Sequence, residues 1–192
     1  MIGLGNAGAG FQVYIENRPP LPQYQNLTEL RAMQPGEIAA IAQETGNHWR
    51  KIFNVYAKLV FAVNPAGFSR WQDLRDQQLL QQGSGQALLF SPPDVSVKTA
   101  GDTQSGSGQP GTVRLLLARK YADALGLTVD EVKVSHSSGR GDWAGEEGRS
   151  WRWLDADFAV HKASGLILCP YFDYRQLSDV RIQRLVSWLK RA

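Results

Sequence analysis

The sequence predicts an α/β domain with three layers, in which helices flank a short, mixed and mostly parallel sheet that ends in a late antiparallel hairpin. Two apolar runs without alternation, residues 87–90 and 166–169, are typical of strands covered on both faces. Residues 48–63 repeat apolar side chains at the spacing of a helix that packs against such a sheet. Because 192 residues is close to the usual size of one domain, we expect a single domain over residues 1–192.

The composition favours a cytoplasmic protein with a substantial hydrophobic core. Hydrophobic residues make up 43% of the chain and include six tryptophans, which is more than a disordered chain carries. The single cysteine, Cys169, excludes an intramolecular disulfide and favours a reducing compartment. We expect neither a signal peptide nor a membrane partner, since no leader and no run of about 18 apolar residues is found. A net charge of +3 permits contact with nucleic acid without requiring it.

The first ten residues are expected to form a flexible tail. Gly3, Gly5 and Gly8 match the GxGxxG pattern of dinucleotide-binding folds, but that pattern needs a strand before it and a helix after it. Only two residues precede it, and residues 11–15 alternate like a strand. We therefore expect residues 1–10 to lead into an edge strand rather than to bind a dinucleotide.

Three helices and a strand are predicted between residues 35 and 90. The first helix, residues 35–45, begins with a proline, and the second, residues 48–63, carries the wide apolar stripe. Arg50, Lys51 and Lys58 lie away from that stripe, so we assign them to a solvent-exposed face. A third helix begins at an S-x-x-Q capping box, residues 69–72, and extends to about residue 82.

The second half begins with a long Gly/Ser-rich segment. Residues 94–111 are expected to be a flexible loop, either a lid over an active site or a disordered segment. A helix is predicted from Thr112 to residue 125, since Gly126 suits its C-terminal end. A Walker NTPase is excluded, because Thr112 stands where the phosphate-binding lysine would be. Strands are predicted at residues 132–136 and 153–161, and the latter should pair with residues 166–169 in the late hairpin.

The leading candidate site is the loop after residues 166–169. Ligands of open α/β sheets bind beyond the carboxyl ends of the strands, and here the chain continues with Asp173, Tyr174, Arg175 and Gln176. In that order, these residues supply a hydrogen-bond acceptor, a ring that can stack, a guanidinium that donates two parallel hydrogen bonds, and an amide. Such groups can bind the edge of a base or a phosphate. We assign Asp173 the catalytic role of orienting water or a base. The alternative is that Asp173 and Arg175 pair with each other while the tyrosines close the end of the sheet.

A second candidate is the stretch of residues 140–153, which is rich in arginine and tryptophan. Arg140, Trp143, Arg149 and Arg152 could bind phosphate and stack on bases, and a stacked base contributes about 1–3 kcal/mol. The alternative is that the tryptophans of this stretch cover a hydrophobic edge. Asp155, Asp157 and His161 fall on one face of the strand predicted at 153–161, but the outer face of a hairpin explains them without a metal. We expect no metal and no cofactor.

Two tracts, residues 46–59 and 169–178, resemble an uncharacterised bacterial family with no assigned activity. That resemblance implies no functional residues. More loosely, the order of elements is similar to that of uracil-DNA-glycosylase-like domains, although Cys169-Pro170-Tyr171 stands in the place of their His-Pro-Ser loop.

Two classes of function follow from the sequence, and it does not choose between them. The first is a nucleotide- or nucleic-acid-directed protein, binding or hydrolytic, whose partner is a nucleotide or a single strand. The second is a non-enzymatic protein–protein interaction module that uses the Arg/Trp-rich stretch. Oligonucleotide binding that weakens steeply with salt favours the first, whereas salt-insensitive self-association lost on mutating Trp143 or Trp151 favours the second. The oligomeric state does not follow from either.

Overall fold

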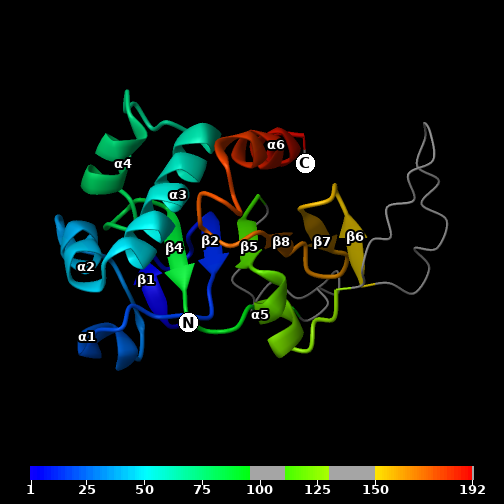
Figure 1. Cartoon of the computed structure of the whole chain (residues 1–192), viewed down its shortest axis with the longest axis horizontal. Helices are drawn as coiled ribbons and strands as arrows, with labels where there is room; N and C mark the ends of the chain where they lie inside the picture. The colour runs from blue at the N-terminus through cyan, green and yellow to red at the C-terminus, as the bar shows by residue number, and fades with distance from the viewer. Residues whose placement is uncertain (96–110, 130–149, 192) are drawn as a thin grey trace.

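The computed structural model describes residues 1–95, 111–129 and 150–191. In these ranges the chain forms one eight-stranded mixed sheet and six helices, which confirms an α/β fold (Figure 1). The strands are β1 (Gly3–Gly5), β2 (Phe11–Tyr14), β3 (Leu30–Arg31), β4 (Gln86–Leu89), β5 (Val113–Leu117), β6 (Trp151–Trp153), β7 (Ala159–His161) and β8 (Ile167–Cys169). The helices are α1 (Pro22–Gln25), α2 (Glu37–Thr45), α3 (Asn47–Val63), α4 (Trp71–Gln77), α5 (Arg119–Ala124) and α6 (Asp179–Leu189).

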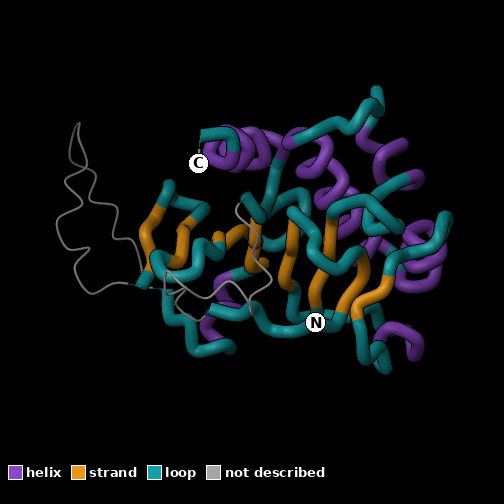
Figure 2. Tube along the Cα trace, turned by 180° about the vertical axis from the view of Figure 1, so that it is seen from behind, coloured by secondary structure: helices purple, strands orange, loops and turns teal. Residues whose placement is uncertain are grey.

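The sheet has a parallel centre and antiparallel pairs toward both sides. The strand order is β3-β1-β4-β2-β5-β8-β7-β6, and Figure 2 shows the strands side by side from behind. Strand β2 is parallel to both β4 and β5, and β5 is parallel to β8. Strand β7 pairs antiparallel with β8 and with β6, which confirms the predicted late hairpin.

Helices cover the two faces of the sheet unequally. Val13 and Leu115 point to the face that packs against α2, α3, α4 and α6, which we call the α3 face. Tyr14 and Leu116 point to the opposite face, which packs against α5 and which we call the α5 face. Because successive side chains of a strand alternate between faces, both faces of the central strands are buried. No helix within the described ranges combines the length and the apolarity needed to cross a bilayer.

The first ten residues are not a flexible tail, because β1 lies inside the sheet between β3 and β4. The glycines permit an unusually close antiparallel pairing with β4. A Cβ atom on Gly3 would lie 2.3 Å from the carbonyl oxygen of Leu88, and one on Gly5 would lie 2.2 Å from that of Gln86. Gly5 also has a φ of +117°, which side-chain-bearing residues rarely adopt. Strand pairing therefore accounts for the first two glycines of the GxGxxG match.

Two further predictions about the sheet are wrong. Strand β2 is central rather than an edge strand, since β4 and β5 flank it. The predicted helix from Thr112 to residue 125 is instead strand β5 followed by the short helix α5. Three consecutive leucines have no periodicity that separates a helix from a buried strand. This segment forms a strand because it pairs with a parallel strand on each side.

The predicted helices agree better with the structure. Helices α2 and α3 are confirmed, and α6 begins after Ser178 as expected, although the Ser178 side chain makes no capping hydrogen bond. Helix α4 ends at Gln77 rather than near residue 82. The strand predicted over 153–161 is only partly confirmed, because its last three residues form β7 whereas residues 154–158 form the turn between β6 and β7. Residues 132–136 and most of the predicted 94–111 loop lie outside the described ranges.

Candidate functional site

Four parallel strands end at the same edge of the sheet. Strands β2, β4, β5 and β8 share one direction, so the residues that follow them gather at one edge. The chain leaves β2 toward helices α2–α4 on the α3 face, whereas it leaves β5 toward α5 on the opposite face. Connections that diverge in this way open a crevice at the carboxyl ends of neighbouring strands. Residues 16–18 after β2 and residues 170–176 after β8 lie at this edge.

The loop after β8 runs along helix α3. The Tyr171 ring stacks on His48, with 5.8 Å between ring centroids. One turn further on, Lys51 Nζ lies 2.9 Å from Asp173 Oδ2. Asn54 Nδ2 then donates to the Tyr174 hydroxyl at 2.7 Å.

Lysines of α3 therefore contact protein rather than only solvent. Lys58 Nζ lies 5.5 Å from the centre of the Tyr174 ring and 2.8 Å from Asp179 Oδ1. Together with the Lys51–Asp173 pair, this contact shows that these two lysines are only partly solvent-exposed on the face predicted for them. Arg50 is exposed as expected.

Asp173 is fully engaged by groups of the chain itself. Its Oδ1 accepts the backbone N–H of Arg175 at 2.9 Å, and its Oδ2 pairs with Lys51. The Arg175 amide and then the Lys51 ammonium lower the pKa of the Asp173 carboxyl below its ordinary value. The carboxylate pairs with the backbone of Arg175, not with its guanidinium as the alternative reading expected.

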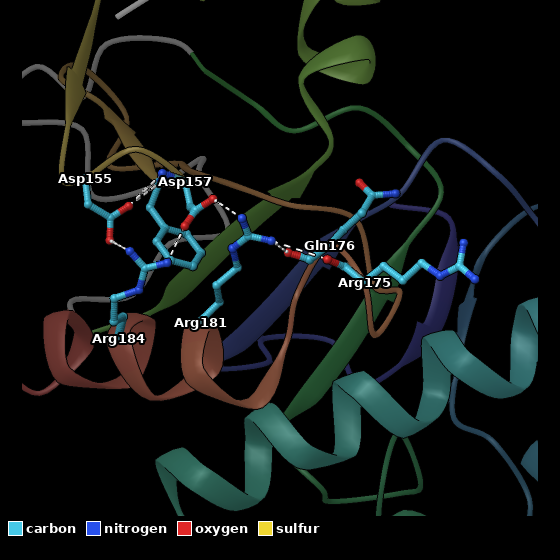
Figure 3. A network of polar contacts seen from close by, with 7 residues as sticks. Asp155, Asp157, Arg175, Gln176, Arg181 and Arg184 are labelled. Carbon is cyan, nitrogen blue, oxygen red and sulfur yellow. Dashed lines mark hydrogen bonds and ion pairs between the residues drawn. The ribbon is translucent and has the colours of Figure 1, made fainter. Parts of the chain in front are cut away.

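Of the other predicted residues of this loop, Tyr174 lies against α3, whereas Arg175 and Gln176 face outward. Tyr174, Arg175 and Gln176 are exposed, and the Arg175 side chain points away from the polar network around it (Figure 3). Arg152 is exposed on β6, at the edge of the sheet, and strand β7 separates β6 from β8. The remaining candidates, Arg140, Trp143 and Arg149, lie outside the described ranges.

A polar pocket of about 490 Å³ lies beyond the end of β2. Its lining comes from the β2–α1 connection, from α1 and from the α2–α3 junction: Glu16, Asn17, Arg18, Pro20, Gln25, Thr45, His48 and Trp49. Arg18 is half-buried and fixed at one nitrogen. Its Nη1 donates to the carbonyls of Gln25 at 2.8 Å and Leu27 at 2.9 Å, and the guanidinium lies over the Phe90 ring at 5.7 Å. Among the described residues, Nε and Nη2 of Arg18 have no acceptor.

An aromatic pair borders this pocket. His48 is exposed on the pocket side of α3, and its Nε2 lies 3.1 Å from the Tyr171 hydroxyl. Asn17 Nδ2 donates to the same hydroxyl at 3.4 Å. Burial raises the pKa of Tyr171, so the phenol is neutral at physiological pH. The pocket thus combines a fixed guanidinium, an exposed ring and carboxamide and carboxylate groups, a set that can hold a polar ligand with one anionic end.

The aspartates of the β6–β7 turn pair with arginines of α6. Arg184 lies 3.3 Å from Asp155 and also pairs with Asp157, while Arg181 Nη2 lies 2.9 Å from Asp157 (Figure 3). His161 lies elsewhere, on the α5 face, where its Nδ1 is 2.9 Å from Ser164 Oγ. Within the described ranges, no three His, Cys, Asp or Glu side chains form a group that could hold a metal ion.

Sequence reasoning missed Glu16, Asn17 and Arg18. They directly follow the apolar run of residues 11–15, so the rule that selected the loop after β8 applies equally here. The sequence predicts an edge strand at this run, and that prediction points to no site after it. Recognising β2 as a central parallel strand is the signal that would have found them.

Comparison with known proteins confirms the resemblance to an uncharacterised family. A family model described as a family of unknown function (DUF6942) matches residues 2–190. No curated protein and no solved structure matches the chain. The two tracts that carry the resemblance, residues 46–59 and 169–178, are the ones that lie against each other at the edge of the sheet.

Proposed function

The chain belongs to the DUF6942 family of unknown function, and we propose that it binds a nucleotide in the pocket beyond β2. The observation that carries this proposal is Arg18, a guanidinium fixed through Nη1 whose Nε and Nη2 have no acceptor among the described residues. Such a preorganised edge suits two oxygens of one phosphate, because guanidinium presents parallel donors and loses little entropy on binding.

The rest of the pocket supports a nucleotide over inorganic phosphate. The exposed His48 ring is backed by Tyr171, which forms a surface on which a base can stack. Glu16 and Asn17 offer a carboxylate acceptor and an amide for the hydroxyls of a sugar. A volume of about 490 Å³ lies in the range usual for small-molecule sites.

A single nucleotide is favoured over a polynucleotide. Lys51 and Lys58 on α3 and Arg75 on α4 are each paired with an aspartate at 2.7–2.9 Å. Cations that already pair with aspartates would displace few counterions from a nucleic acid, so an extended phosphate backbone would gain little binding free energy there. We propose binding without hydrolysis, since Asp173, the catalytic candidate of the sequence, does not line this pocket and is held by Lys51 and the Arg175 amide.

The interaction-module alternative receives less support. Trp151 is buried and Trp153 is partly buried in the core of the α5 face, so these two rings are not free to dock a partner. This packing matches the reading in which tryptophans of the Arg/Trp-rich stretch cover a hydrophobic edge.

Calorimetric titration with nucleoside monophosphates tests the proposal, with the matching nucleosides and inorganic phosphate as comparison ligands. We expect R18Q to weaken monophosphate binding about 30-fold and H48A about tenfold, the losses typical of a charge-assisted hydrogen bond and of base stacking. R175Q is the matched control and should bind like the parent chain. Loss of binding in R175Q but not in R18Q would move the site to the loop after β8, and no binding of any monophosphate would end the proposal.

A further inference from the structure

Four polar or polar-tipped residues lie in one row across the α5 face, near the amino ends of the parallel strands. Gln12 on β2 is in register with Arg114 on β5, and His161 on β7 is in register with Trp151 on β6. Leu166, just before β8, lies between the two pairs, because its carbonyl accepts the His161 amide at 2.8 Å. We call these four residues the polar row.

Arg114 is the charged member of the polar row and is 7% exposed. Its Nη2 donates to the Asp94 carbonyl at 2.5 Å, its Nη1 donates to the Ser164 carbonyl at 3.4 Å, and its guanidinium lies 5.7 Å from the centre of the Tyr14 ring. Its Nε is buried and has no hydrogen-bond partner. No carboxylate of the described residues lies within ion-pair distance of this guanidinium.

Among the described residues, this buried positive charge has only neutral partners. A buried charge is costly unless an opposite charge or a complete set of hydrogen bonds compensates it. The two carbonyl groups and the Tyr14 ring compensate part of this cost, but the Nε–H group of Arg114 donates to no acceptor. A second donor of the row, Trp151 Nε1, is also buried without a partner.

We propose that the polar row is a second binding site, in which Arg114 binds the carboxylate of a small molecule through Nε. A monoanion fits because the row carries one positive charge: burial lowers the pKa of His161, which keeps its imidazole neutral at physiological pH. Trp151 Nε1, the second buried donor of the row without a partner, would donate to an acceptor elsewhere in the ligand. This site lies near the amino ends of the strands and is independent of the proposed nucleotide pocket, which lies beyond their carboxyl ends.

Arginine Nε–Hε resonances in ¹H–¹⁵N spectra test this site on the intact chain. The Arg114 signal is assigned by its loss in R114K. At constant ionic strength in chloride, acetate should shift this signal saturably, while sulfate should not. The absence of a saturable shift with acetate, or a shift with sulfate alone, would overturn the proposal.

Stability measurements supply a second readout. Acetate should raise the thermal midpoint of the parent chain relative to chloride, and R114M should lose this rise completely. R152M, which removes an exposed arginine of β6, and R18Q, which removes the guanidinium of the nucleotide pocket, should both keep it. Because R18Q leaves the polar row intact, failure of the nucleotide proposal and failure of the carboxylate proposal are distinguishable. An acetate effect that survives in R114M would contradict the assignment.

Discussion

At the scale of single residues, Asp173 shows how a side chain chosen for chemistry can hold the backbone instead. Its carboxylate fixes the Arg175 amide and pairs with Lys51, 122 positions earlier in the chain. The sequence places an acidic residue after a buried strand, but nothing in it identifies a partner on α3. Local spacing therefore predicted where the group lies, and only the tertiary fold determined what it binds.

We expect D173N to lower the free energy of unfolding by about 1 kcal/mol at neutral pH, since the Lys51 pair is partly exposed. The folded-state pKa of Asp173 is lowered, so its stabilisation is complete above the ordinary carboxyl pKa of about 4. It disappears as the pH falls through the lower, folded-state value. Urea unfolding of both proteins across this pH range should show the two stabilities converging in acid. A constant difference at all pH values would rule out ionisation as its cause.

Gly3 gives a second test at this scale, with Gly10 as a matched control. A Cβ on Gly3 would meet the Leu88 carbonyl oxygen at 2.3 Å, a backbone atom that cannot move without disturbing the sheet. Open space surrounds the corresponding position on Gly10. In urea unfolding, G3A should therefore cost about 2–3 kcal/mol, whereas G10A should change stability by less than about 0.5 kcal/mol. Equal effects would refute the close approach of β1 and β4.

At the scale of elements, patterns with a clear period were predictable and patterns without one were not. Helix α3 follows from its apolar stripe, and β8 follows from an uninterrupted apolar run bounded by proline. Strand β5 was missed because its leucine run fits a buried helix equally well, and α5 begins only after Ala118 turns the chain with a φ of +71°. The pocket beyond β2 was missed for the same reason, because its position depends on β2 having parallel neighbours on both sides.

Arg181 links two elements that flank the loop after β8. Its Nη1 donates to the carbonyls of Gln176 at 2.8 Å and Arg175 at 3.4 Å, while its Nη2 pairs with Asp157 in the β6–β7 turn (Figure 3). R181M should therefore loosen the loop. We expect amide hydrogen exchange of Gln176 and Leu177 to accelerate about fivefold, the effect of losing roughly 1 kcal/mol of local stability.

R184M is the matched control for this experiment. Arg184 pairs with Asp155 and Asp157 but makes no hydrogen bond to the loop carbonyls among the described residues. Exchange at Gln176 and Leu177 should change less than twofold in this variant. Equal acceleration in both variants would show that the ion pairs with the turn, rather than the two carbonyl contacts, hold the loop.

At the scale of the whole molecule, the two halves of the chain share one core. The cluster on the α3 face joins residues from β1, β2 and α2–α4 with residues from β5, β8 and α6. Tyr56 at its centre is fully buried, donates to the carbonyls of Phe11 and Ala87, and packs 5.6 Å from Phe172. Neither half can bury its apolar surface without the other, because α3 from the first half supports the loop and helix from the second.

The chain should therefore unfold as one cooperative unit. We expect urea transitions followed by tryptophan fluorescence and by far-ultraviolet circular dichroism to coincide within error, as they do for two-state single domains. The six tryptophans lie in both halves of the sequence, so a half that unfolded alone would separate the two signals. A chain truncated after Pro93 should fail to fold, because β2 and α3 would lose β5, β8 and α6. Two separated transitions, or a cooperative transition in the truncated chain, would show instead that the first half is a domain of its own.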